Sequence, residues 1–285
     1  MGLREDLRND PWQAATRFKD RVYDLAEVID YIRSALRSSD QDELYNAIEF
    51  IRALRSQLPL DAYKQIFSHV FTDKRILSEL VRSDNILKAI SRNYNYALGL
   101  LTLLESLVLI GMEELQYQVI LELLKKAAEK LSDDEYRELY RAMIHGPIRT
   151  LGVSMLARLL REMSMIRGND KLLMFKSELL VSIPLEYPAK VLAENESLVE
   201  GLRDLLRNTV EEILLISSDK PDIALESYKE IRLFITLLMS LCGRPGEENM
   251  CGIVNQVLEP SKTTIDTLSR VMAGYLGEES GLKNI

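Results

Sequence analysis

Apolar and polar residues repeat along this chain with the spacing of α-helices from one end to the other. The clearest stripe follows Asp10-Pro11, where apolar residues recur at alternating intervals of three and four. Its members are Ala15, Phe18, Val22, Leu25, Ile29, Ile32 and Leu36. This spacing predicts one long helix, from Pro11 to about Arg37, that lies nearly parallel to a neighbouring helix.

The partner of that stripe can be read in two ways. Asp40-Gln41-Asp42-Glu43 is a capping box, and it predicts a second long helix that ends before Pro59. We expect these two helices to pack together as an N-terminal helical hairpin over residues 1–58. The alternative is a homodimer in which the heptad stripe of the first helix meets its copy in a second chain.

The segment from Tyr94 to Ile110 is apolar nearly all round, which predicts a central, buried helix. One narrow seam of small and polar residues interrupts it, formed by Asn95, Gly99, Thr102 and Ser106. A seam of this kind lets another backbone approach closely. Shorter helices are expected before it, over about 59–70, 72–81 and 83–92.

Start and stop signals continue to the end of the chain. They predict helices over about 112–131, 132–145, 148–166, 170–183, 184–193, 195–216 and 218–242, with two more beyond. We therefore predict an all-α fold of about a dozen helices, arranged as an irregular α-solenoid of HEAT-like hairpins or as a large helical bundle. No sequence period chooses between them, and residues 59–285 are expected to form a multi-helix array continuous with the hairpin as one domain.

Charge is distributed unevenly along the 285 residues. The net charge of -8 argues against a generic nucleic-acid binder, whose affinity comes mainly from a basic field. Between Leu139 and Ser177, however, seven basic residues face two acidic ones, and the next stretch, to Asp219, carries nine acidic against three basic residues. A basic block thus lies beside an acidic one.

The basic block, residues 137–176, supplies our candidates for partner binding. Arginine side chains suit carboxylate or phosphate groups, and two tyrosines one turn apart could add an anchoring or stacking contact. The candidates are Tyr136, Arg137, Tyr140, Arg141, Arg149, Arg158, Arg161, Arg167, Lys171 and Lys176. A solvated helix face that pairs with Glu162 and the acidic neighbour explains the same charges without any partner.

Catalytic patterns are scarce. The chain has two histidines, His69 and His145, which lie 76 positions apart without a second ligand at metal-binding spacing. We therefore expect no metal, no cofactor and no enzymatic activity. The carboxylate of most interest is Glu105, because it lies in the Leu-rich central helix, where an unpaired charge would be costly.

The expected cellular location rests on the N-terminal segment, the most apolar run and the cysteines. MGLREDLRND lacks the apolar core of a signal peptide, and the most apolar run, Ala97 to Ile110, is shorter than the ~20 residues of a membrane span. Cys242 and Cys251 fit a reduced interior better than a disulfide framework, although a bridge between them remains open. The expected location is cytoplasmic, without membrane contact.

These patterns lead to three functional hypotheses. The first is a non-enzymatic scaffold or adaptor that binds a partner protein on a helical groove or face. The alternative is a nucleic-acid-associated protein that uses the basic block 137–176. The third is a helical enzyme that uses a buried carboxylate, for which Glu105 is the candidate.

Overall fold

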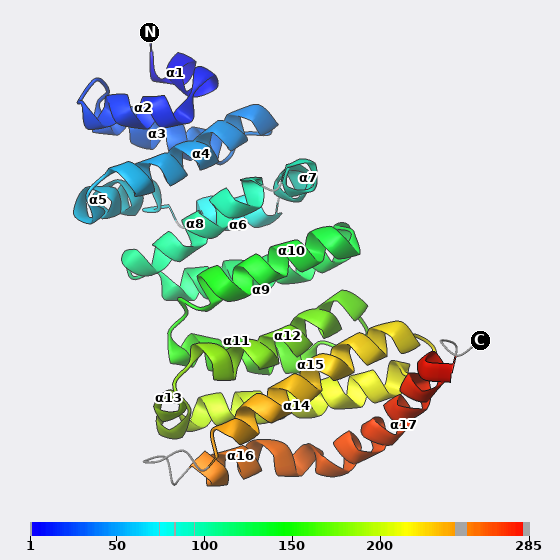
Figure 1. Ribbon diagram of the computed structural model, residues 1–285. Helices are drawn as coiled ribbons and strands as arrows, with labels where there is room; N and C mark the ends of the chain where they lie inside the picture. The colour runs from blue at the N-terminus through cyan, green and yellow to red at the C-terminus, as the bar shows by residue number, and fades with distance from the viewer. Residues whose placement is uncertain (1, 74, 83, 94, 243–249, 282–285) are drawn as a thin grey trace. The chain divides into compact units, whose positions relative to one another are not determined.

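The computed structural model describes residues 2–73, 75–82, 84–93, 95–242 and 250–281, and within these ranges the chain forms helices and no strand (Figure 1). The all-α class predicted from the sequence is therefore confirmed. The packing divides the chain into a first unit, Met1–Leu151, and a second unit, Gly152–Ile285. This division falls between residues 151 and 152, not at residue 58, where the expected N-terminal hairpin ends.

The first unit is built from ten α-helices and a π-helical turn within its described residues. They are α1 (Leu3–Asn9), α2 (Pro11–Lys19), α3 (Leu25–Ala35), α4 (Gln41–Gln57), α5 (Leu60–Val70), α6 (Arg75–Arg82), α7 (Asp84–Arg92), α8 (Asn95–Leu109), α9 (Glu113–Lys130), α10 (Asp133–Met143) and η1 (Ile144–Ile148). Helix α2 packs on α4, α4 on α8, and α8 on α9 and η1. In addition, α3 packs on α5, and α6 packs on α9.

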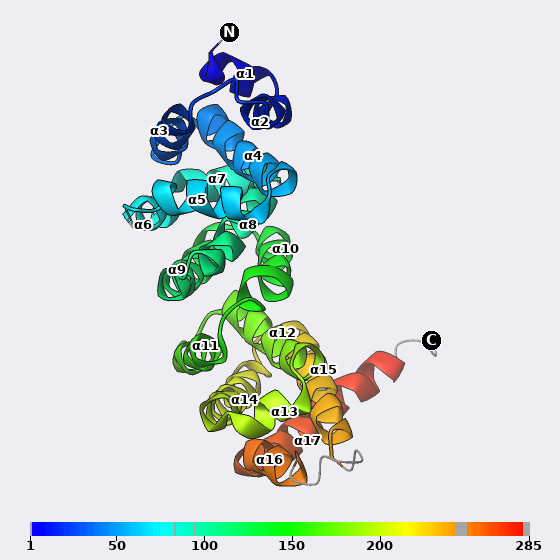
Figure 2. The same ribbon diagram turned by 90° about the vertical axis from the view of Figure 1, so that its left-hand side faces the viewer.

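The second unit repeats one packing relationship. Its elements are α11 (Val153–Met165), α12 (Asp170–Glu186), α13 (Ala189–Glu194), α14 (Glu196–Ile216), α15 (Pro221–Ser240), α16 (Met250–Leu258), η2 (Glu259–Ser261) and α17 (Lys262–Gly281). Helix α11 packs along α14, and α12 packs along α15 (Figure 2). Helices three apart in chain order therefore lie along one another in this unit. The choice between a solenoid and a bundle stays a prediction.

Helix starts follow the sequence signals closely. The carboxylate of Asp10 accepts hydrogen bonds from the backbone N–H groups of Trp12, at 2.9 Å, and Gln13, at 3.1 Å, and so caps α2. Ser132 and Glu135 form a reciprocal capping box at the start of α10. Because these groups satisfy backbone donors that have no partner inside the helix, they fix where each helix begins.

The long first helix predicted from Pro11 to Arg37 is wrong, because the chain turns after Lys19 and starts α3 at Leu25. The N–H of Val22 bonds to the carbonyl of Arg17, and the N–H of Arg21 to that of Phe18. These are the two bonds of a Schellman motif, with Arg21 at φ 61° in the left-handed position that usually holds glycine. The continuous heptad stripe proposed for a homodimer therefore does not form.

A buried acid explains why the chain turns at this point. Tyr23, on the turn between α2 and α3, is buried and donates a hydrogen bond from its hydroxyl to the carboxylate of Asp6 on α1. Arg17 on α2 pairs with the same carboxylate at 2.5 Å. Val22, which the stripe would have buried, is instead 60% exposed. Packing onto α1 therefore overrides the heptad spacing.

The small-residue seam of the central helix has the predicted effect. A methyl group at Gly99 on α8 would overlap the side chain of Ile48 on α4, so the two helices approach closely only because residue 99 is glycine. Nearby, the hydroxyls of Ser106 on α8 and Tyr63 on α5 share a hydrogen bond of 2.8 Å. The seam thus serves packing in the core of the first unit.

Other boundaries differ from the prediction by a turn or more. Pro184, which was expected to start a new helix, lies inside α12, which continues to Glu186, and the second half of the predicted segment 184–193 forms the separate helix α13. Helix α11 starts at Val153 rather than near Ile148, because Ile148 belongs to the π-helical turn η1. Gly146 and Pro147 interrupt the regular helix there, and Gly146 has φ -112° and ψ -105°.

Cys242 and Cys251 form a disulfide, so the expectation of reduced cysteines is wrong. Cys242 follows the end of α15 and Cys251 lies in the first turn of α16, and the packing of α16 on α15 places their Cα atoms 4.7 Å apart. That separation is within the range of protein disulfides. The cysteines therefore no longer support a reducing compartment. The cytoplasmic location stays a prediction.

None of the described helices combines the length and the apolar character that a membrane-spanning helix needs.

Candidate functional site

The two tyrosines proposed as an exposed anchor are core residues of the first unit. Tyr136 is 1% exposed and Tyr140 is fully buried, and their rings meet edge to face with centroids 5.3 Å apart. Burial raises the pKa of Tyr136 well above its usual range. The prediction that this pair offers a stacking edge to a partner is therefore wrong, because α10 turns this face toward the core.

The basic candidates are divided between the two units. Arg137 and Arg141 lie on α10, and Arg149 follows η1, all in the first unit. Arg158, Arg161, Arg167, Lys171 and Lys176 belong to the second unit, on or next to α11 and α12. Together they span two separately packed units, and the structure brings Arg161, Arg167 and Lys176 against α14.

Helices α11 and α14 run side by side in the same direction, and ion pairs follow their outer surface. Arg161 pairs with Glu200 at 2.5 Å, and Arg167 pairs with Glu211 at 2.8 Å. Arg167 also donates a hydrogen bond to the side-chain oxygen of Asn208. These arginines therefore contact the acidic block, as the partner-free explanation of the basic block expects. The side chains of these pairs are between 39% and 48% exposed, so each pair contributes only about 0–1 kcal/mol to stability.

Two large apolar side chains lie on the same outward helix surfaces. Met165 is 82% exposed and follows Arg161 by one turn of α11. Leu215 is 70% exposed and follows Glu211 by one turn of α14. We define the α11–α14 face by the ion-pairing residues Arg161, Arg167, Glu200 and Glu211 together with Met165 and Leu215.

Lys176 has a role that its charge did not predict. It is fully buried, pairs with Glu212 of α14, and donates to the carbonyl oxygen of Ile166 at 2.9 Å. The second oxygen of Glu212 accepts from the N–H of Gly168 at 2.8 Å. Burial lowers the pKa of Lys176, and the negative charge of Glu212 opposes that shift. Lys176 thus connects α12 to α14 and to the end of α11 in the interior of the second unit.

Glu105 is half-buried on α8 and faces the π-helical turn. A Cβ atom at Gly146 would lie 2.6 Å from one of its carboxylate oxygens. Burial raises the pKa of Glu105, and the positive charge of Arg55 acts in the opposite direction. No described residue donates a hydrogen bond to this carboxylate. Of the histidines, His69 and His145 are both exposed, and among the described residues no group of three or more His, Cys, Asp or Glu side chains could hold a metal ion.

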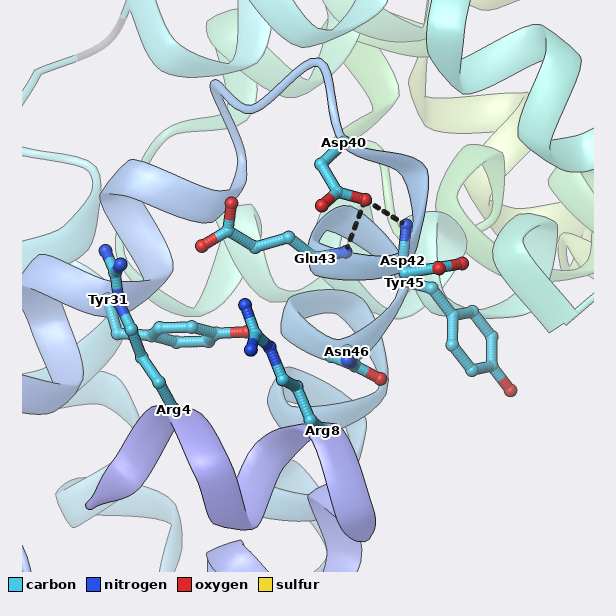
Figure 3. Close-up of a pocket in the computed structure, with 8 residues that line it drawn as sticks. All are labelled: Arg4, Arg8, Tyr31, Asp40, Asp42, Glu43, Tyr45 and Asn46. Carbon is cyan, nitrogen blue, oxygen red and sulfur yellow. Dashed lines mark hydrogen bonds between the residues drawn. The ribbon is translucent and has the colours of Figure 1, made fainter.

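A cavity that the sequence did not reveal lies in the first unit between α1, α3 and the start of α4 (Figure 3). Its volume is about 430 Å³. Arg4 and Arg8 of α1 form one side, and Asp40 and Glu43 at the start of α4 form the opposite side. Tyr31 of α3 completes it. These residues come from three helices, and a sequence pattern alone does not bring them together.

No protein-family model matches this sequence, and no curated protein matches it either.

Proposed function

We propose that this protein is a non-enzymatic scaffold or adaptor that binds a partner protein on the α11–α14 face. The observation that carries the proposal is the exposure of Met165 and Leu215 beside a row of charged pairs. Interfaces combine an apolar centre with a polar rim, and exposed apolar side chains of this size favour burial against a partner. The ion pairs hold their side chains in one arrangement, so little further ordering is needed on binding.

The nucleic-acid alternative has weaker support. Glu200 and Glu211 already occupy Arg161 and Arg167, so a phosphate would have to displace a carboxylate at each arginine. The enzyme hypothesis keeps Glu105 as its candidate residue, and a homodimer would need a surface other than the interrupted heptad stripe.

The test compares capture of proteins from a cell extract of the source organism by the wild-type chain and by Met165→Glu/Leu215→Glu. We expect one stoichiometric protein that survives nuclease and high salt and is lost with the double variant. Val22→Glu is the matched control, because Val22 is 60% exposed in the first unit and its change should leave capture intact.

Two results would contradict the proposal. Capture that is unchanged by Met165→Glu/Leu215→Glu would place the interface elsewhere. Recovery that disappears with nuclease or salt, and with Arg158→Glu/Arg161→Glu, would favour nucleic-acid binding, because phosphate contacts weaken steeply as salt rises.

A further inference from the structure

The cavity between α1, α3 and α4 in the first unit has two oppositely charged sides. Arg4 and Arg8 are one turn apart on α1, so their side chains leave the same side of that helix. Figure 3 shows both reaching into the cavity, with Asp40 and Glu43 across from them. Neither arginine has a hydrogen bond or ion pair with another described residue.

On the acidic side of the cavity, several carboxylate oxygens are available to accept hydrogen bonds. One oxygen of Asp40 accepts the N–H groups of Asp42, at 2.9 Å, and Glu43, at 3.4 Å, which caps α4. Within the described ranges, the other oxygen of Asp40 and the whole carboxylate of Glu43 make no hydrogen bond. Opposite charges that face one another normally pair when they can reach, so here the cavity keeps them apart.

The third feature is the hydroxyl of Tyr31. Tyr31 is only 6% exposed, yet no described residue forms a hydrogen bond with its hydroxyl, and the residue lines the cavity. Burial raises the pKa of Tyr31 to about 12, with Glu43 adding to the shift and Arg4 and Arg8 opposing it. The hydroxyl therefore stays protonated and can donate. A ligand in the cavity can accept a hydrogen bond from this hydroxyl, because no described residue already does.

We propose that this cavity binds a small zwitterion whose carboxylate lies between Arg4 and Arg8 and whose primary ammonium group faces Glu43 and Asp40, the chemistry of a free amino acid or a short peptide. Its volume of about 430 Å³ suits such a molecule, because small-ligand sites occupy roughly 300–1,000 Å³. The hydroxyl of Tyr31 donates to the carboxylate. A simple anion would meet the acidic side, and a simple cation the arginines, so only a molecule with both charges satisfies the two sides.

This site is independent of the α11–α14 face. It lies in the other unit, shares no residue with that face, and takes a small molecule rather than a protein. Either proposal can therefore fail without affecting the other.

The first experiment titrates the full chain with glycylglycine and with glycine by isothermal calorimetry, which distinguishes a peptide from a free amino acid. N-acetyl-glycylglycine and glycylglycinamide serve as blocked forms that keep one charge each. We expect one of the two zwitterions to bind at one site per chain. Each blocked form of the dipeptide should bind about tenfold more weakly than the dipeptide itself, because a charge-assisted hydrogen bond is lost.

The second experiment pairs variants with blocked ligands. Glu43→Gln should weaken binding of glycylglycine about tenfold and leave the acetylated form unchanged, because that form has no ammonium group. Arg8→Gln should weaken glycylglycine and leave the amide unchanged. Tyr31→Phe should reduce affinity several-fold, and Arg232→Gln, an exposed arginine of the second unit, is the control that should have no effect.

Three outcomes would overturn the proposal. One is that neither zwitterion gives binding heat. Another is that both blocked forms bind as tightly as glycylglycine, which would mean that the two charges are not read together. The last is that Glu43→Gln weakens the zwitterion and its acetylated form equally, which would place the ammonium group elsewhere. Arg8 is exposed and Glu43 is half-buried beside the cavity. Unfolding of these variants, followed by circular dichroism, therefore separates lost binding from lost structure.

Discussion

Lys176 and Glu212 form an ion pair in the interior of the second unit, where Lys176 has no solvent exposure. The pair is not isolated, because Ile166 and Gly168 supply a backbone carbonyl at 2.9 Å and a backbone N–H at 2.8 Å. Ile166 and Gly168 lie between α11 and α12, whereas Lys176 lies on α12 and Glu212 on α14. The packing of α14 against the segment between α11 and α12 therefore depends on a buried network in which each charged group has hydrogen-bond partners.

Removing one member of this network should be far more damaging than removing both charges. We predict that Lys176→Met lowers the free energy of unfolding by about 3–5 kcal/mol, because it leaves the carboxylate of Glu212 buried without its cation. The double variant Lys176→Met/Glu212→Met should recover part of that loss. Urea unfolding followed by circular dichroism measures both.

The control for this prediction is Lys220→Met. Lys220 pairs with Asp170 at 2.5 Å in the same unit, but its side chain is 49% exposed. An exposed pair contributes about 0–1 kcal/mol, so this variant should remain close to wild type. Equal losses for Lys176→Met and Lys220→Met would refute the special role of the buried pair.

The left-handed residue at the end of α2 leads to a stabilising substitution. Arg21 occupies the position of a Schellman motif where a side chain is strained, whereas the same motif at the end of α8 has Gly111 at φ 73°. We predict that Arg21→Gly raises the free energy of unfolding by about 0.5–1 kcal/mol, because glycine adopts this conformation without strain. Thermal unfolding should show a higher Tm for Arg21→Gly and no gain for Arg21→Ala, and a lower Tm for the glycine variant would count against the assignment.

These cases show which parts of the fold could be predicted from the sequence. Local signals such as Asp10, Asp40 and Ser132 act on backbone groups within three residues, so they placed the starts of their helices well. The turn at Arg21 was missed because it lacks glycine and because the interaction that favours it, between Tyr23 and Asp6, spans 17 residues. Spacing alone therefore predicted a continuous helix.

The candidate surfaces show the same limit. Charge counting found the basic block but could not tell that Lys176 is buried while Arg161 is half exposed, because that depends on which helix packs against which side. The cavity was missed altogether, since Arg4, Tyr31 and Glu43 come from three helices. No periodic pattern joins residues at those separations.

Two helical glycines with different surroundings predict opposite outcomes for substitution by alanine. Gly99→Ala should destabilise the protein by about 1–3 kcal/mol, because the added methyl group overlaps Ile48 in a packed core. Gly252→Ala on α16 meets no neighbour within 4 Å and should stabilise by about 1 kcal/mol, because alanine favours helix. Chemical denaturation of the two variants checks the pair, and a gain at both positions would mean that α4 and α8 pack less closely.

Glu105 provides a prediction about pH. Burial raises its pKa above the ordinary value of 4.5, so the folded state disfavours the charged form. The resulting contribution to stability is fully present below pH 4.5 and is lost as the pH rises through the folded-state pKa. Glutamine does not titrate, so Glu105→Gln should be similar to wild type in acid and at least as stable at neutral pH. Urea unfolding at pH values on both sides of this range measures the difference.

If the free energy of unfolding of the wild type instead rises relative to that of the variant as the pH rises, then the fold stabilises the charged carboxylate and Arg55 outweighs burial. Because the variant should remain folded, it also gives a clean test of the enzyme hypothesis, in which loss of an activity could be assigned to the carboxylate itself.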